Sequence, residues 1–383
     1  MLAWTAATIW ALAGLYALIS ICVLVGARRL VRTPGRPPDA PLPFVTVLVA
    51  ARDEERHIEA CLRSLLAQDY PGDLYEVVVV NDRSTDGTPR LIAEMVEGNP
   101  NLVAVDIDEE PHGITGKQNA LRVGIHHCRG ELVLNTDADC IAPPTWVSAM
   151  VSRFGPDVGL VMGIPLAHSP GADVSLLTRV QSLDLAFLLH TAVGSAGCGN
   201  PASCIGNNFA YRRKALDDVG GYDAMPPSLT EDAVLMRALH SQTNWRIAAG
   251  NTPGAVVLTE PATSWRGFYR QRSRWILGGR ETHSPAVKVL YVILLYNWVL
   301  LLTPAGIAFV PELRAACIGA LCAKFVADFA VAWQACGQLA RRDVLRAYVP
   351  FSAYYLMYGA LIGMAALFSR KVLWKGQVYR RRR

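Results

Sequence analysis

No charged side chain occurs within residues 1–27 of this 383-residue chain, and its nine cysteines include no CxxC pair. The cysteine spacing argues against a zinc site or a disulfide framework and fits a reducing compartment. The net charge of +5 is small for a chain of this length. So weak an excess of basic residues gives no support for nucleic acid as a partner.

The uncharged N-terminus is one long apolar run over residues 2–26, and about 20 such residues span a bilayer. A cleaved signal peptide would need a basic region ahead of a shorter apolar core, so a retained anchor over residues 1–27 is favoured. Four arginines follow at once, namely Arg28, Arg29, Arg32 and Arg36. By the positive-inside rule they place the next domain in the cytosol, as in a multi-pass protein of a bacterial-type plasma membrane.

Three further apolar runs lie near the other end, at about 286–310, 312–335 and 347–369, and a basic tail follows over 370–383. The tail is also expected in the cytosol, but four crossings in all would leave it outside. One run must therefore lie in the membrane interface or re-enter. The run around Pro304 is the candidate, because Arg270, Arg274 and other basic residues precede it like the polar side of an interfacial helix.

The middle of the chain has the pattern of an α/β domain. Apolar, β-branched runs at 44–50, 76–80 and 131–134 indicate buried strands, and helical patterns follow at 58–66 and 86–95. Such alternation predicts a doubly wound, mostly parallel sheet, whose ligands bind beyond the carboxyl ends of the strands. The predicted organisation is an anchor, a catalytic domain over 40–270, an interfacial segment over 271–288, membrane helices over 289–369 and the basic tail.

Acidic residues follow three of these strands. Asp137 and Asp139 can converge on one hard cation, Mg²⁺ or Mn²⁺, together with phosphate oxygens and water, although a solvated acidic loop is the alternative. Asp82 is placed to accept hydrogen bonds from a base or ribose. Next to it, Ser84 or Thr85 is expected to cap the following helix, and Asp86-Gly87 suits a turn.

Three more segments carry polar side chains suited to catalysis or phosphate binding. Thr230-Glu231-Asp232 opens a helical pattern, where it offers either a helix cap or a general base near an acceptor hydroxyl. Gln271 to Trp275 fits either an interfacial belt of basic and aromatic residues or a site in which Arg274 binds a diphosphate. Lys117 is either a phosphate ligand or a surface lysine.

In this order, the segments resemble the family 2 glycosyltransferases with a GT-A fold, over essentially the whole chain. The matching segments are 51–55, 80–88, Gly116-Lys117, Asp137-Ala138-Asp139, 206–208 with 220–223, 230–232 and the QxxRW motif at Gln271 to Trp275. The tail segment 374–379 is similar to that of the branch with ceramide glucosyltransferase-like and carotenoid glycosyltransferase-like enzymes. Two positions depart from the pattern: Asp53 stands where Asn is usual, and Asn81 where Asp is common.

The resemblance implies a role for each matching residue. Glu54 and Asp82 would hold the uridine of a UDP-sugar, Lys117 its diphosphate, and Asp137 and Asp139 the ribose and the metal-bound diphosphate. Asp232 would be the base, and Gln271, Arg274 and Trp275 would lie where donor and acceptor meet. The implied activity is inverting, metal-dependent transfer of a hexose to the hydroxyl of a membrane lipid.

Two other functions stay open at this point. One is processive polysaccharide synthesis, similar to the hyaluronan and poly-N-acetylglucosamine synthases, in which the QxxRW motif is common. The other is a non-catalytic membrane scaffold that keeps the fold, against which the presence of both Asp139 and Asp232 argues.

Overall fold

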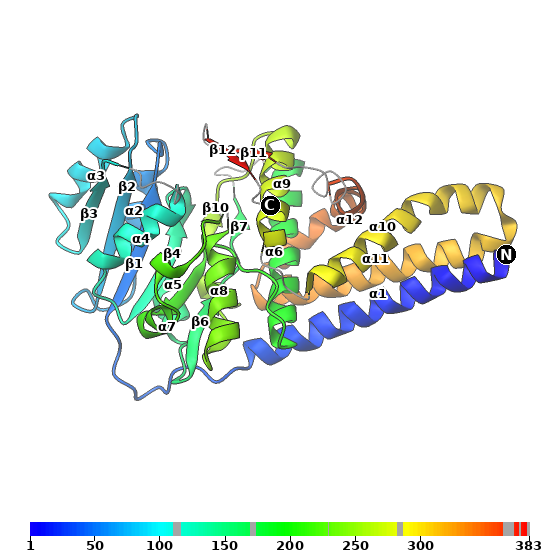
Figure 1. The fold of residues 1–383 in the computed structure, drawn as a ribbon, viewed down its shortest axis with the longest axis horizontal. Coiled ribbons are helices and arrows are strands. Elements are labelled where there is room, and N and C mark those ends of the chain that lie inside the picture. The colour runs from blue at the N-terminus through cyan, green and yellow to red at the C-terminus, as the bar shows by residue number, and fades with distance from the viewer. Residues whose placement is uncertain are drawn as a thin grey trace.

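The computed structural model describes residues 1–109, 116–168, 174–228, 230–281, 286–362, 371–374 and 377–380. They form a body built around a β-sheet and, extending from it, a bundle of long helices with the N-terminus at its far end (Figure 1).

The body contains one large sheet of seven strands in the order β3-β2-β1-β4-β8-β6-β9. Only β8 runs antiparallel to its neighbours; the other pairs are parallel. The predicted doubly wound, mostly parallel sheet is therefore confirmed. The strands are β1 (Val45–Ala51), β2 (Tyr75–Asp82), β3 (Leu102–Ile107), β4 (Leu132–Asp137), β6 (Val158–Met162), β8 (Phe209–Arg212) and β9 (Arg246–Ala249). A small second sheet joins β5 (Cys140–Ile141), β10 (Leu258–Thr259) and β7 (Leu166–Ala167).

Both faces of the large sheet are buried, which explains why its strands read as unbroken apolar runs. On β2, Val77 and Val79 belong to one core and Val78 and Val80 to the other. Helices cover both cores. They are α2 (Ile58–Leu66), α3 (Thr88–Val96) and α5 (Trp146–Val151) on the first, and α4 (Lys117–Gly124), α7 (Arg213–Asp218) and α8 (Glu231–Gln242) on the second.

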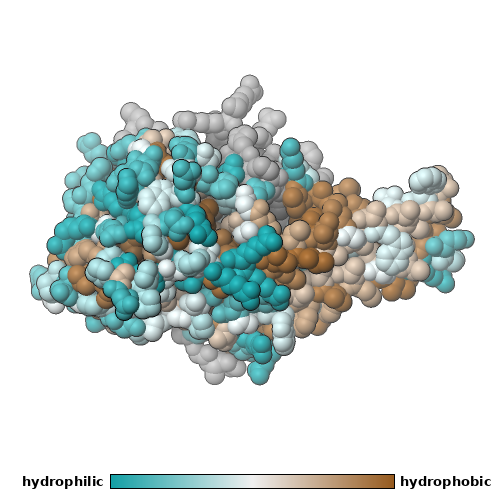
Figure 2. Space-filling model, turned by 90° about the horizontal axis from the view of Figure 1, so that it is seen from below, coloured by the Kyte–Doolittle hydropathy of each residue, from teal (hydrophilic) through white to brown (hydrophobic). Residues whose placement is uncertain are grey.

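Three helices are long and apolar enough to cross a membrane among the residues described, namely those within Leu2–Val31, Tyr291–Phe309 and Pro311–Gln338. They are α1 (Leu2–Val31), α10 (Ala286–Phe309) and α11 (Arg314–Gln338), which lie side by side in the bundle (Figure 1). Hydrophobic surface covers this bundle, whereas the body is mostly hydrophilic (Figure 2). The helix α6 (Leu176–Gly197) packs on α1 and α11, so it connects the body to the bundle.

A polar cluster lies inside the bundle. Lys324 Nζ on α11 donates to Asp328 Oδ2 at 2.7 Å and to the Tyr16 hydroxyl on α1 at 3.1 Å, and that hydroxyl donates to Asp328. Charged groups at membrane depth are costly unless they are paired. The cluster therefore links α1 to α11 without leaving a charge alone.

The run around Pro304, predicted to lie in the interface or to re-enter, forms part of α10, one of the three helices that are long enough to cross. The third apolar run instead holds α12 (Tyr348–Met357), only 10 residues long, and a π-helical turn, η6 (Tyr358–Ile362). If only α1, α10 and α11 cross the membrane, residues 339–347 return to the side of the catalytic body. Three crossings instead of four therefore agree with a tail on the cytosolic side.

The predicted segment boundaries differ in detail from the helices. The helix α9 (Trp265–Glu281) begins within the segment assigned to the catalytic domain and carries the QxxRW motif. In the basic tail, β11 (Lys371–Trp374) pairs with β12 (Gln377–Arg380). Residues 363–370, 375–376 and 381–383 of the last run and the tail lie outside the described residues.

Candidate functional site

The site is formed at the carboxyl ends of three neighbouring strands. The central strand β1 pairs in parallel with β2 and β4, so that Ala50 lies beside Val80 on one side and Asp137 on the other. Because parallel strands end at the same edge, the segments that follow them meet there. The acidic clusters of the sequence thus converge, as predicted.

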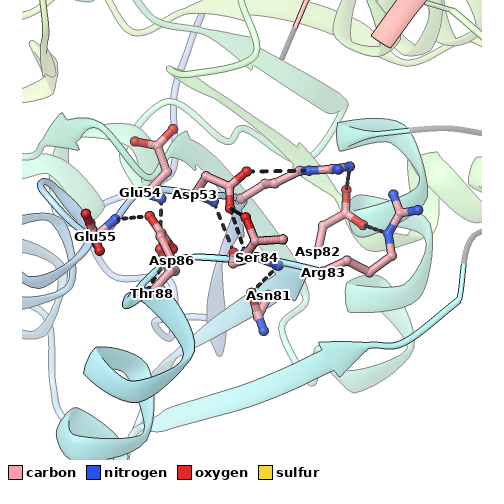
Figure 3. Close-up of polar contacts among 11 residues, drawn as sticks. Asp53, Glu54, Glu55, Asn81, Asp82, Arg83, Ser84, Asp86 and Thr88 are labelled. Carbon is pink, nitrogen blue, oxygen red and sulfur yellow. Dashed lines mark hydrogen bonds and ion pairs between the residues drawn. The ribbon is translucent and has the colours of Figure 1, made fainter. Parts of the chain in front are cut away.

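The segments after β1 and β2 are joined by hydrogen bonds (Figure 3). Asp53 Oδ1 accepts from the Thr85 amide at 2.7 Å, and the Asp53 amide donates to Ser84 Oγ at 3.1 Å. The Glu54 amide donates to Thr88 Oγ1 at 2.8 Å. Ser84 and Thr85 therefore hold the segment after β1. The expectation that one of them caps α3 is wrong, because Gly87 occupies the cap position.

Two residues of these segments have unusual backbone conformations. Asp53 has a φ of 52° and Arg83 a φ of 53°, in the left-handed region that few residues other than glycine adopt. Such conformations persist where surrounding contacts enforce them, often at functional sites. Asp and Asn tolerate this region best among non-glycine residues, so the change from the usual Asn to Asp53 keeps the conformation.

Asn81 explains the second departure from the family pattern. Its amide Nδ2 donates to Asp106 Oδ1 on β3 at 2.7 Å, and its Oδ1 accepts from the Ser84 amide at 3.3 Å. An aspartate here would put two carboxylates in contact and remove the donor. Asn81 therefore positions the segment after β2.

Asp82 and Glu54 both lie at the edge of the sheet, where a nucleoside is expected. Asp82 is buried and pairs with Arg83 Nε at 2.8 Å and with Arg52 Nη1 at 3.8 Å. The Glu54 carboxylate points away from the hydrogen bond that the Glu54 amide makes with Thr88 (Figure 3). His57 Nδ1 lies 3.1 Å from Glu54 Oε2. On its other side, His57 Nε2 lies 2.5 Å from Glu260 Oε2, so that the imidazole links two carboxylates.

Lys117, the first residue of α4, lies among acidic side chains. Its Nζ pairs with Asp137, lies 3.6 Å from Glu231 Oε1 and donates to the Gly206 carbonyl at 3.2 Å. Burial lowers the pKa of Lys117, but the charges of Asp137 and Glu231 outweigh this and raise it overall. The side chain is thus a permanent cation in the site, and the reading of Lys117 as an ordinary surface lysine does not fit. At Gly206 an added Cβ would lie 2.8 Å from this amine, so only glycine fits there without displacing it.

Asp139 differs from Asp137 in its environment. Burial, and then the charges of Asp137 and Glu54, raise the pKa of Asp139 to about 6. A carboxylate destabilised in this way is a suitable ligand for a hard cation, which would relieve the repulsion. Among the described residues no group of three or more His, Cys, Asp or Glu side chains is arranged to hold a metal ion. A cation held by Asp137 and Asp139 would therefore have to take its remaining ligands from phosphate and water.

Asp232 lies in the first turn of α8 and is buried. Burial, and then the neighbouring Glu231, raise the pKa of Asp232 to about 7. Among the described residues, its Oδ1 accepts one hydrogen bond, a local one from the Ala233 amide at 2.7 Å. Within the same part of the chain the Thr230 side chain makes no capping bond, so the helix-cap reading of this segment loses its main support.

The residues of the QxxRW motif lie on two faces of the helix α9, one toward the cavity and one toward α6. Gln271, Arg274 and Trp275 line the same cavity as Lys117 and Asp232. Between them, Arg272 is 1% exposed, pairs with the buried Asp184 of α6 and stacks on the ring of Trp275 at 4.0 Å. Arg272 therefore anchors the helix, and its neighbours in the motif face the site.

A single cavity of about 1230 Å³ lies between these segments, although Asp53, His57 and Arg272 are not among the residues that line it. One end is polar, with Glu54, Asp82, Asp137, Asp139 and Lys117. The other is lined by residues of the bundle and of α6 and η6, among them Leu18, Ile19, Leu188, Ile293, Leu294 and Tyr358. All nine predicted site residues line this cavity. The sequence analysis missed His57 and Glu260 as polar members of the site; of these, only His57 had a signal, in its i,i+3 spacing from Glu54.

The fold and the cavity define a GT-A-type glycosyltransferase built onto membrane helices. The family model for glycosyl transferase family 21 matches residues 8–383, so the chain belongs to this family. The family is of the family 2 type, which confirms the predicted relationship. The protein is therefore a glycosyltransferase, and the reading as a non-catalytic scaffold is set aside.

Curated relatives and a solved structure agree with this assignment. The chain is 30% identical over 288 residues to the beta-monoglucosyldiacylglycerol synthase of Synechocystis sp., covering 73% of this chain and 57% of that protein. It is 30% identical over 240 residues to the poly-beta-1,6-N-acetyl-D-glucosamine synthase of Staphylococcus aureus, covering 62% of this chain and 55% of that protein. The chain thus spans little more than half the length of these relatives.

A mannosyltransferase from Pyrobaculum calidifontis, solved in complex with GDP-Man and Mn²⁺, has a similar fold. The TM-score is 0.61 at 23% identity, with 96% of this chain and 99% of that chain covered. This likeness in fold covers nearly the whole chain.

Proposed function

We propose that this protein transfers a hexose from a UDP-sugar to the hydroxyl of a membrane lipid, with inversion of the anomeric centre. The observation that carries the proposal is the continuity of the cavity from the acidic edge of the sheet to side chains of α1 and α10. A charged donor suits the first end and apolar chains suit the second. The Synechocystis relative, a monoglucosyldiacylglycerol synthase, supports the same class of acceptor and glucose as the sugar.

The donor would bind at the polar end. Glu54 and Asp82 hold the uridine, and Lys117 and Arg274 offset the charge of the diphosphate. Gln271 and Trp275 lie where the sugar meets the acceptor. Asp137 pairs with Lys117, and this pair supports a position for that carboxylate beside the ribose and the diphosphate.

A divalent cation, Mg²⁺ or Mn²⁺, would be held by Asp139 with Asp137. When bound it neutralises charge that develops on the leaving diphosphate. The raised pKa of Asp139 is the feature of this chain that supports the assignment. The Pyrobaculum mannosyltransferase, which shares the fold, was solved with Mn²⁺.

Asp232 acts as the general base. Its carboxylate takes the proton of the acceptor hydroxyl as the oxygen forms a bond to the anomeric carbon. The bond from that carbon to the diphosphate oxygen breaks on the opposite face, and UDP leaves with the electron pair. One displacement inverts the centre, and no covalent sugar–enzyme intermediate forms. A base whose pKa lies near 7 is suited to this role at neutral pH.

The test is direct. Full-length protein is purified, incubated with radiolabelled UDP-glucose and other nucleotide sugars in the presence of total membrane lipid, and the products are separated by chromatography. We expect one labelled glycolipid with a single sugar. Labelled product in the water-soluble or high-molecular-mass fraction alone would contradict the proposal.

The second candidate is a polysaccharide synthase. The similarity to the Staphylococcus aureus poly-beta-1,6-N-acetyl-D-glucosamine synthase favours it, at an identity close to that of the lipid synthase. Against it, only α1, α10 and α11 have the length of membrane spans among the described residues, which is few for a secretion pore. Product length separates the two: one sugar on a lipid, or a polymer.

Localisation follows from the basic residues that flank the membrane segments. Arg28 to Arg36 follow α1, and the tail over 370–383 is basic. We place the catalytic body and the tail in the cytosol, at a bacterial-type plasma membrane.

A further inference from the structure

The carboxylate of Glu260 belongs to the immediate surroundings of the proposed cation site. Strands β5 and β10 are antiparallel, with Thr259 opposite Cys140. The residue after Thr259 is Glu260 and the residue before Cys140 is Asp139, so these two lie side by side at the end of the ladder. Both line the polar end of the cavity. A cation bound to Asp139 would thus have a further carboxylate beside it, and carboxylates are preferred ligands of hard divalent cations.

Glu54 is a second carboxylate near this position. Burial, and then the charges of Asp137 and Glu54, raise the pKa of Asp139, so Glu54 is an electrostatic neighbour of the cation site. Together with Glu260, the surroundings of the site hold four carboxylates, which would be enough to bind a divalent cation without any substrate. Nevertheless, within the described ranges of the chain no three such side chains are arranged around one point.

His57 explains why these carboxylates do not converge. Its Nδ1 lies 3.1 Å from Glu54 Oε2, and its Nε2 lies 2.5 Å from Glu260 Oε2. An imidazole with a proton on each nitrogen donates one hydrogen bond to each of the two carboxylates. His57 is not among the residues that line the cavity. Its contacts therefore hold Glu54 and Glu260 at the wall of the cavity.

We infer that His57 keeps Glu54 and Glu260 off the cation, so that the cation binds tightly only together with the diphosphate of the donor. This inference rests on the proposed function. With Glu54 and Glu260 engaged by His57, Asp137 and Asp139 remain for the cation, and phosphate oxygens have to supply further ligands. Binding of the cation and binding of the donor are then cooperative, and each tightens the other by the same factor. His57 is thus a positioning residue, and the same contacts keep Glu54 in place for the uridine.

The quantity that measures this role is the coupling factor, the ratio of the Kd for Mn²⁺ without UDP to the Kd with saturating UDP. Coupling between two ligands is typically about 5- to 150-fold, and we expect the wild-type protein to lie in this range. The His57→Ala variant releases both carboxylates, which can then bind the cation in the absence of UDP. Its Kd for Mn²⁺ alone should fall, and its coupling factor should drop by at least about fivefold.

The experiment titrates full-length protein in detergent with Mn²⁺, with and without UDP, and follows the free ion by electron paramagnetic resonance. His57→Phe keeps a ring but removes both nitrogens, so it should behave like His57→Ala and replaces it if the alanine variant does not fold. Adding Glu260→Ala to His57→Ala removes one released carboxylate and should recover part of the coupling. The control is His126→Ala, because His126 is exposed and is not among the residues that line the cavity. It should couple as wild type does.

The direction of the change distinguishes this role from a merely structural one. A variant that only disturbs the fold binds Mn²⁺ more weakly, whereas release of the carboxylates makes Mn²⁺ alone bind more tightly. A coupling factor near one in wild type, a factor unchanged in the His57 variants, weaker binding of Mn²⁺ alone in them, or no recovery on adding Glu260→Ala would overturn the inference. Neither sugar nor acceptor is present in the titration. Failure of sugar transfer to any lipid, with the coupling as expected, would therefore contradict the proposed function alone.

Discussion

Replacement of Asp232 by asparagine separates catalysis from folding at the centre of the site. The substitution keeps the size of the side chain but removes its ability to accept a proton at neutral pH. Loss of a general base typically lowers the rate by about 10² to 10⁴. The diphosphate is held by Lys117, Arg274 and the cation in our proposal, so UDP affinity should stay within about twofold of wild type.

The same substitution should lower the transfer rate but raise the stability of the folded protein at neutral and higher pH. The pKa of Asp232 is raised from its ordinary value of 3.8 to about 7, first by burial and then by Glu231. Because the folded state holds this proton more tightly than the unfolded state, the contribution to stability is fully present below pH 3.8 and is lost as the pH rises through about 7. At about 1.4 kcal/mol per pKa unit, the ionised group costs at most about 4 kcal/mol at pH 8, a figure that already includes the attraction to Lys117. Asp232→Asn should therefore raise Tm at pH 8 and leave it unchanged at low pH.

The assay pairs the transfer rate, UDP affinity and Tm in the same preparations. Wild-type activity should rise with pH around a midpoint near 7, where the carboxylate becomes ionised, and the residual activity of the variant should lack this transition. Asp223→Asn is the control, since Asp223 is 62% exposed and pairs with Arg122 away from the cavity; it should behave as wild type. Near-normal transfer in Asp232→Asn would contradict the base assignment and direct attention to Glu231. So would a fall in Tm that corresponds to a loss of more than about 1 kcal/mol in the free energy of unfolding.

Three further predictions test other parts of the site. Excess chelator should abolish transfer and Mg²⁺ or Mn²⁺ should restore it, with Asp139→Asn requiring more metal; full activity in chelator would exclude the metal site. Arg272→Met should cost about 3 to 5 kcal/mol, seen as a lower Tm, because it leaves the Asp184 charge buried and alone. Adding Asp184→Leu should recover most of the loss, and no recovery would show that the pair does not act as one unit. Cysteine labelling should place residues 28–36 and the tail at 370–383 on the same, cytosolic side; a map that separates them would refute the topology.

The parts of the fold that local pattern determines could be predicted from the sequence. Strands β1, β2 and β4 are buried on both faces, so each is a continuous apolar run that ends at its acidic residues. The parallel arrangement then brings those ends together without knowledge of any individual contact. This explains why Asp82, Asp137 and Asp139 were assigned to one site although their spacing in the chain is wide.

Contacts between distant segments had no signature in the sequence. Glu260 meets His57 only because β10 pairs with β5 and β7, and Arg272 meets Asp184 only because α9 packs on α6. The run around Pro304 was assigned to the interface because basic residues precede it, and that pattern says nothing about how far the helix extends. In the structure the helix continues through Pro304. Prolines are tolerated in membrane helices where neighbouring groups satisfy the backbone that they leave unpaired.

The location of the cavity at the junction of body and bundle has an energetic reason if the acceptor is a lipid. Taking a 16-carbon chain out of the bilayer costs about 0.8 kcal/mol per CH₂, or about 13 kcal/mol for one chain. A nucleotide sugar carries charges that cannot enter the membrane at comparable cost. The two substrates can therefore meet only where a charged pocket opens directly onto apolar helix surface. In this chain α6 packs on α1 and α11, and Asn200 and residues 202–207 after it line the cavity beside Lys117 and Asp232. The same helix thus fixes the bundle against the catalytic edge, so that in our proposal the chains of a lipid would stay among the helices while its hydroxyl reaches Asp232.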